Sequence, residues 1–255
     1  MLIGFTTTTF LNIKSIEKIV GIAVSCGADC IEWGGNLHVT NVEEAKKAKE
    51  LCSAAGIKIS SYGSYYRVGS GDAAEWKRIC LIASAMGAPA VRVWLGKSDS
   101  EKTDDAEYKS LVSDAKAMCA VAEEYGISVC CECHGNTYNN NTDAFLKISK
   151  DVGSDNFRTY FQSRYCRKEY DLDRIERTLP LTGMVHISYS EQRREQFPKH
   201  DSSYIDSILK KLVSVGFDGD MLVEFTYPLM KKGMPLFLKR DISELKTKLG
   251  TLKEI

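Results

Sequence analysis

The segment EYGISVCCE, residues 124–132, places the end of a helical pattern, a glycine and a strand pattern next to one another. Glycine just beyond a helix adopts the left-handed conformation at little cost, so Gly126 marks the point where a helix ends and a strand begins. A repeated helix–glycine–strand order predicts βα units and a parallel sheet. The same order recurs in SCGADCIEW (25–33), AAGIKISSY (54–62), MGAPAVRVW (86–94) and SVGFDGDMLVEF (214–225).

The rest of the chain continues this alternation. Strands are expected at 2–6, 29–33, 57–62, 89–94, 127–134, 157–162, 182–188 and 220–225, and helices at 14–26, 41–55, 73–87, 104–125, 142–152, 171–179, 202–215 and 241–249. Eight βα units in 255 residues predict an α/β fold, a single (β/α)8 TIM barrel domain over residues 1–255. The alternative is an open doubly wound sheet, but GFTTTTFLN (4–12) is no Gly-rich phosphate loop.

The composition bounds the class of protein. Hydrophobic residues make up 44% and charged residues 27%, which is sufficient for a globular core. Thirty-four basic residues balance 34 acidic ones, so the charge favours neither nucleic acid nor a membrane surface as a partner. We read no signal peptide at the start and no apolar run near the ~20 residues of a membrane span. We therefore expect a cytoplasmic protein, and the sequence leaves open whether it forms a homo-oligomer.

The nine cysteines are scattered, although three of them fall in VCCECHGNTYNNN (129–141). Side chains alternate along a strand, which places Glu132 and His134 on the same face as Cys130 and the other two cysteines on the opposite face. The three thiols therefore cannot converge on one zinc ion, and no second Cys-x-x-Cys pair completes such a site. We expect nine free thiols, most of them packed between barrel and helices.

Polar residues gather where the predicted strands end, which is where (β/α)8 barrels carry their function. Each has a simpler interpretation: a buried Glu can pair with an Arg, and His186 can be a hydrogen-bonded core histidine. Carboxylate, imidazole and amide groups at the ends of strands five to eight nevertheless suit a divalent ion, Mn²⁺, Mg²⁺ or Zn²⁺. His38 and His200 lie in polar loop contexts and are expected at the surface. The strand-end residues are Glu32, Tyr62, Tyr65, Arg67, Arg92, Trp94, Glu132, His134, Gln162, His186 and Glu224.

At these positions the chain resembles the sugar phosphate isomerase/epimerase family of xylose isomerase-like barrels. The resemblance implies a divalent ion held by Glu132, Gln162, His186 and Glu224, with the two glutamates as acid and base. Gln162 stands where the family has Asp, which removes a negative charge and predicts weaker ion binding. The matching segments are IEWGGNLHV (31–39), SYGSYYRVG (61–69), VRVWLG (91–96), CECHGNTYNNNTD (131–143), RTYFQ (158–162), VHIS (185–188) and MLVEF (221–225).

The leading hypothesis is a metal-dependent isomerase or epimerase that moves a proton on a small sugar through an enediolate. The alternatives are an inosose-type dehydratase on the same scaffold and a sugar-binding barrel without catalysis. DNA-repair endonucleases share the barrel, but their three-metal cluster needs more than the four histidines present. The residues expected to contact the sugar are Glu32, Tyr62, Tyr65, Arg67, Arg92, Trp94, His134 and Arg193.

Overall fold

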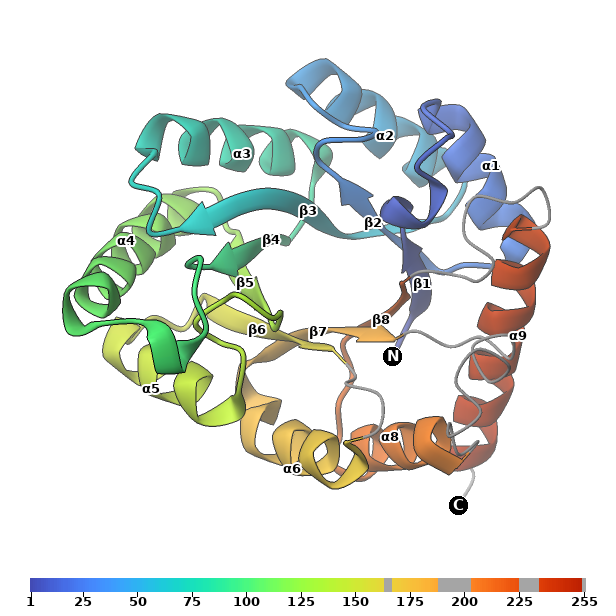
Figure 1. Cartoon of the computed structure of the whole chain (residues 1–255). Coiled ribbons are helices and arrows are strands. Elements are labelled where there is room, and N and C mark those ends of the chain that lie inside the picture. Colours follow the sequence, from blue (N-terminus) through green and yellow to red (C-terminus); the bar gives the residue numbers. More distant parts are fainter. Residues whose placement is uncertain (163–166, 188–202, 225–233, 254–255) are drawn as a thin grey trace.

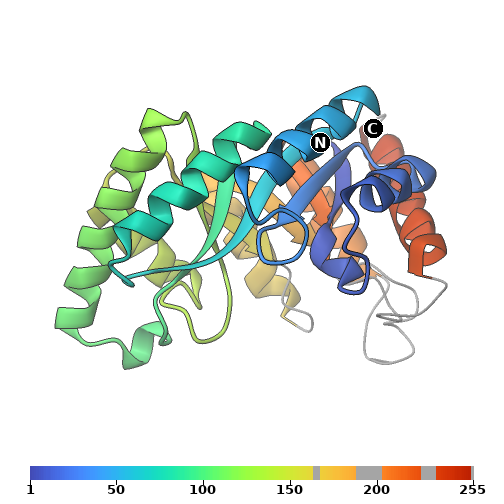
Figure 2. The same cartoon turned by 90° about the horizontal axis from the view of Figure 1, so that it is seen from above.

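The computed structural model describes residues 1–162, 167–187, 203–224 and 234–253. Eight parallel strands close into a barrel in sequence order, and pairing of Ile3 with Met221 joins the first strand to the last. Helices form a ring around the strands, as Figure 1 shows along the barrel and Figure 2 from a direction turned by 90°. The predicted (β/α)8 barrel is confirmed, and the open-sheet alternative is wrong.

The strands are β1 (Ile3–Thr6), β2 (Cys30–Gly34), β3 (Lys58–Val68), β4 (Ala90–Leu95), β5 (Ser128–Glu132), β6 (Phe157–Gln162), β7 (Thr182–Ile187) and β8 (Asp220–Val223). The α-helices are α1 (Ile16–Cys26), α2 (Val42–Ala54), α3 (Ala73–Met86), α4 (Asp105–Glu124), α5 (Thr142–Val152), α6 (Lys168–Thr178), α8 (Ser203–Ser214) and α9 (Met234–Lys253). Short 3-10 helices are η1 (Thr7–Phe10), η2 (Ser100–Lys102) and η3 (Leu179–Leu181).

Local sequence fixes where the helices begin and end. Polar side chains accept hydrogen bonds from backbone N–H groups in the first turn, which satisfies amides that the helix leaves free. The capping residues of α1 to α5 are Ser15, Asn41, Asp72, Asp104 and Asn141. All five glycines of the repeated helix–glycine–strand pattern have φ between 66° and 77°, as expected: Gly27, Gly56, Gly87, Gly126 and Gly216.

The core has two layers, one inside the barrel and one between strands and helices. Cys131 packs in the outer layer, as expected of the cysteines. Cys30 and Cys130 instead point into the barrel, which corrects the expected position of these two. Side-chain alternation turns them inward, where small residues fit beside larger ones. All eight cysteines among the described residues are buried free thiols, and Cys166 lies outside those residues.

The ends of β3 and β5 differ from the predicted ones. β3 continues beyond residue 62 to Val68, with Arg67 paired to Trp94 of β4. β5 stops at Glu132 rather than 134, because the Asn139 side-chain amide donates a hydrogen bond to the Glu132 carbonyl at 3.0 Å and turns the chain. His134 therefore lies in an exposed turn beyond the strand.

His38 is not a surface residue. Its side chain is buried, its Nε2 lies 2.5 Å from the Ile13 carbonyl oxygen, and its ring centroid lies 6.3 Å from that of Trp33. Burial lowers the pKa of His38. The polar loop context was misleading because the loop folds back onto the barrel. His200 lies outside the described residues. Within the described chain, the helices are too short or too polar to cross a membrane.

Candidate metal and substrate site

Four consecutive strands bring the expected ligand residues together. Glu132 and Gln162 end β5 and β6, His186 lies in β7 beside Gln162, and Glu224 directly follows β8. Side-chain ligand atoms of Glu132, His186 and Glu224 lie within 4.8 Å of one another, and all three residues are buried. Gln162 Nε2 donates a hydrogen bond to Glu224 Oε2 at 2.9 Å. The parallel register therefore gathers all four groups at one end of the barrel.

Glu32 contacts this cluster through His186. One of its oxygens, Oε2, accepts hydrogen bonds from Ser61 Oγ at 2.8 Å and Tyr160 Oη at 2.7 Å, and lies 3.3 Å from His186 Nε2. Burial alone raises the pKa of Glu32, but the charge of Arg92 and the contact with His186 outweigh it and hold the pKa well below its usual value. Glu32 is thus an ionised, fully buried group that orients the His186 ring.

Arg92 bridges two carboxylates. Its Nε lies 3.3 Å from Glu32 Oε1, and its Nη1 contacts Glu132 Oε2, which also accepts a hydrogen bond from Trp94 Nε1 at 2.7 Å. A Cβ on Gly63 would lie 2.9 Å from Arg92 Nη2 and 3.1 Å from Glu32 Oε1. The guanidinium can therefore reach both acids only because β3 has a glycine there.

The pKa values of the two carboxyl groups beside the cavity, Glu132 and Glu224, are shifted in opposite directions. Burial raises the pKa of Glu132, but Arg92 and Trp94 act more strongly and lower it overall. Burial also raises the pKa of Glu224; the nearby Glu132 charge adds to this, and the pKa stays raised despite His186 and Arg92. Carboxyl groups whose pKa values are pushed apart are typical of acid and base pairs. Burial lowers the pKa of His186, whereas Glu32 and Glu224 raise it by more.

The donor set fits a divalent cation. Gln162 Oε1 and His186 Nδ1 are buried and have no hydrogen-bond partner among the described residues. Such groups are rare in folded proteins and point to something that occupies the site. Two carboxylates, an imidazole nitrogen and an amide oxygen are suitable ligands. A metal-bound His usually gives its other ring nitrogen to a carboxylate, as His186 Nε2 does toward Glu32.

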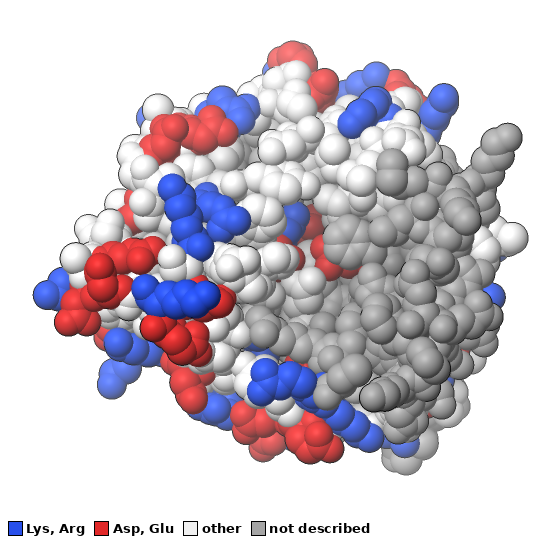
Figure 3. Space-filling model, viewed as in Figure 1, with Lys and Arg blue, Asp and Glu red and all other residues white. Residues whose placement is uncertain are grey.

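A cavity of about 180 Å³ opens above the cluster. Figure 3 shows a hollow near the centre of this face, with acidic and basic atoms inside it. Trp94 forms one wall, with the Tyr65 ring edge-on at 5.5 Å and the His134 ring at 5.8 Å. Aromatic walls above polar groups are suited to a small polyhydroxylated compound. The lining residues are Thr8, Leu11, Tyr65, Arg92, Trp94, Glu132, His134, Gln162 and Glu224.

Other predicted substrate residues lie elsewhere. Tyr62 and Arg67 line a neighbouring cavity, and the Tyr62 hydroxyl donates to the Val39 carbonyl at 3.0 Å. Arg193 lies outside the described residues. Sequence reasoning missed Tyr160, which holds Glu32. Its place two residues before Gln162, hence on the same strand face, is a signal that could have identified it.

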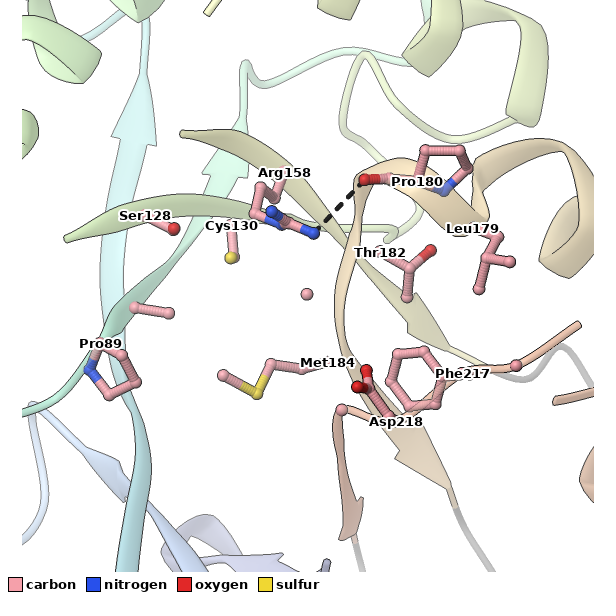
Figure 4. A pocket seen from close by; sticks show the side chains of 14 residues that line it. Pro89, Ser128, Cys130, Arg158, Leu179, Pro180, Thr182, Met184, Phe217 and Asp218 are labelled. Carbon is pink, nitrogen blue, oxygen red and sulfur yellow. Dashed lines mark hydrogen bonds between the residues drawn. The ribbon is translucent and has the colours of Figure 1, made fainter. Parts of the chain in front are cut away.

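A third cavity, of about 390 Å³, lies at the opposite end of the barrel, where the strands begin. Cys130, Arg158 and Met184 border it, and Arg158 Nη2 donates to the Pro180 carbonyl at 3.3 Å (Figure 4). None of the polar strand-end residues lines it. The ligand-type groups therefore belong to the carboxyl end of the strands.

Comparisons with known proteins agree with this architecture. Residues 20–242 match the family described as xylose isomerase-like TIM barrel. No curated protein matches the chain. Three similar solved structures are a probable 3-DHS dehydratase from Bacillus anthracis (16% identity, 96% of this chain and 99% of that one, TM-score 0.78), a D-psicose 3-epimerase from Clostridium cellulolyticum H10 (15%, 100% and 97%, 0.70) and a 3-keto-D-glucoside 4-epimerase from E. coli (15%, 97% and 99%, 0.77). At these identities the structures show the fold alone. The chain belongs to the xylose isomerase-like TIM barrel family.

Proposed function

We propose that the chain is a metal-dependent isomerase or epimerase of a small sugar or sugar-like carbonyl compound. The observation that carries the proposal is the convergence of Glu132, His186 and Glu224, with ligand atoms within 4.8 Å, beside a cavity of about 180 Å³. Two of the similar structures are sugar epimerases, which supports the substrate class.

The ion would be held by Glu132, His186, Glu224 and the free Oε1 of Gln162. When bound, it supplies positive charge that polarises the carbonyl of the substrate. Gln162 contributes no charge, so this donor set binds the ion more weakly than one with a third carboxylate. Glu32 stabilises the arrangement by fixing the orientation of the His186 ring.

The protein groups provide the proton transfer. Glu132 is held ionised by Arg92 and Trp94, and accepts the proton from the carbon next to the carbonyl. Glu224, the other carboxyl group of the cluster, returns a proton on the other side of the substrate. Trp94 and Tyr65 cover the reacting carbons and exclude water. In an epimerisation a proton returns to the opposite face of the same carbon, and in an isomerisation it returns to the neighbouring carbon; neither reaction needs an oxidant or a co-substrate.

A dehydratase is the second candidate. As general acid, Glu224 can protonate a leaving hydroxyl group as readily as a carbon. One of the similar structures is a probable dehydratase. The two reactions begin with the same proton abstraction, so their products distinguish them.

The test is NMR of the Mn²⁺-loaded protein with a panel of ketoses, aldoses and cyclic keto-polyols in D₂O. Isomerases and epimerases place deuterium next to the carbonyl, whereas a dehydratase gives an unsaturated product. Glu132→Gln abolishes exchange, and the matched control Glu124→Gln, on the exposed face of α4, leaves it unchanged. If stoichiometric ion and a bound sugar give no exchange, the non-catalytic sugar-binding hypothesis replaces this proposal.

A further inference from the structure

A cavity of about 380 Å³ adjoins the site beside the ends of β3 and β4. Tyr65 lines both this cavity and the site cavity, so the two spaces meet at its ring. Arg67 and Lys97 also line it. The guanidinium carbon of Arg67 lies 4.5 Å from the centre of the Trp94 ring, the same ring that hydrogen-bonds Glu132. The neighbouring cavity therefore borders the candidate site.

Two cations in this cavity, Arg67 and Lys97, have no counter-charge among the described residues. Arg67 donates one hydrogen bond from Nη1 to the Gly96 carbonyl at 2.7 Å, and its guanidinium stacks on the Trp94 ring. Together these two contacts fix the position of the guanidinium. Lys97 is exposed at the rim. In the described part of the chain, no carboxylate lies within ion-pair distance of Arg67 or Lys97. Both positive charges thus face the cavity.

The remaining charged groups of this cavity are already engaged. Arg78 forms two hydrogen bonds of 2.7 Å with Glu75, from Nε and Nη2. Asp72 caps α3, where its Oδ1 accepts from the Glu75 N–H at 3.0 Å and its charge opposes the positive end of the helix. What remains is an excess of positive charge next to the site. Figure 3 shows basic side chains beside the central hollow.

We propose that this cavity binds a terminal anionic group of the substrate, a carboxylate or a phosphate. The proposal rests on the proposed function and narrows its substrate class to sugar acids or sugar phosphates. The carbon chain would lie along Trp94 and Tyr65, with the reacting carbons at Glu132 and the anion at the other end. A fixed guanidinium presents paired donors that match both anions, and an ammonium group at the rim adds charge.

The test measures binding by calorimetry, so it does not depend on turnover. Mn²⁺-loaded protein is titrated with inorganic phosphate and with neutral, carboxylated and phosphorylated forms of three- to six-carbon sugars. Arg67→Met and Lys97→Met keep the aliphatic stem and remove the charge. Lys77→Met, on an exposed position of α3 outside the cavity, is the matched control. Each cavity variant weakens anionic ligands by about tenfold, as expected for one charge-assisted hydrogen bond, and changes neutral sugars by less than about twofold.

The relative affinities of carboxylated and phosphorylated sugars show whether the cavity binds a carboxylate or a phosphate. The anion subsite is refuted if neutral sugars bind as tightly as anionic ones, if no anionic compound binds, or if the cavity variants behave like Lys77→Met. Failure of the proposed function looks different. In that case anionic sugars bind with the expected dependence on Arg67 and Lys97, but no compound exchanges deuterium.

Discussion

Replacing Gln162 by Glu tests whether this position faces an ion. The change keeps the length of the side chain but puts an oxygen where Nε2 now lies, 2.9 Å from Glu224 Oε2. Two full charges at that distance repel by roughly 6 kcal/mol at an effective dielectric constant near 20. The pair relieves this by keeping a proton, so the pKa of Glu224, already raised, rises further.

The sign of the pH dependence follows from that shift. A carboxyl group whose folded-state pKa lies above its unfolded value destabilises the protein as pH rises from the unfolded pKa toward the folded one. Without an ion we expect Gln162→Glu to lose about 2–4 kcal/mol of unfolding free energy at pH 8 and much less at pH 5. Gln162→Met deletes the same hydrogen bond without adding charge, so its loss should depend on pH much less than that of Gln162→Glu.

Bound Mn²⁺ should offset the loss of stability in Gln162→Glu. It neutralises the added carboxylate, so Gln162→Glu should gain more stability from the ion than wild type does. Urea unfolding of wild type, Gln162→Glu and Gln162→Met at pH 5 and pH 8 measures the pH dependence of the loss. The same experiment with EDTA or Mn²⁺ measures the stability gained from the ion. Equal losses at pH 5 and pH 8, or an equal Mn²⁺ gain in wild type and Gln162→Glu, would refute the placement of Gln162 at an ion site.

The remaining predictions concern Glu224, Arg92 and the cysteines. Glu224→Gln should lower turnover at least ~10²-fold and weaken Mn²⁺ binding; unchanged turnover would rule out its acid–base role. Arg92→Met leaves the buried Glu32 and Glu132 without their cation and should cost about 3–5 kcal/mol in urea unfolding; a loss below about 1 kcal/mol would contradict this bridge. Burial raises the pKa of Cys130 to about 12, so iodoacetamide at pH 8 should leave it unlabelled in native protein. Peptide mapping after denaturation should find all nine thiols alkylated, and any disulfide would contradict the expected free state.

Much of the fold could be predicted because its signals are local. The left-handed glycines such as Gly126 and capping residues such as Asn141 act within a few residues of their own position. Eight repeats of one local pattern leave few topologies that bury every strand. The places where prediction failed depend on distant partners: the extra length of β3 requires pairing with β4, and His38 is buried by a loop that folds back.

The sequence by itself determined the barrel and the polar groups at its strand ends, because periodicity and the alternation of side chains decide which residues face inward. Only the tertiary structure decided how those groups act on one another. Glu32 and Glu132 are 100 positions apart in the chain, yet both contact Arg92. Likewise, only the tertiary structure shows that Gln162 Oε1, Arg67 and Lys97 have no hydrogen-bonding or charged partner of the expected kind among the described residues: no donor for Oε1 and no carboxylate for the two cations. Burial and charge act through space, so the pKa directions, the proposed ion site and the proposed anion subsite all depend on residues that are far apart in the sequence.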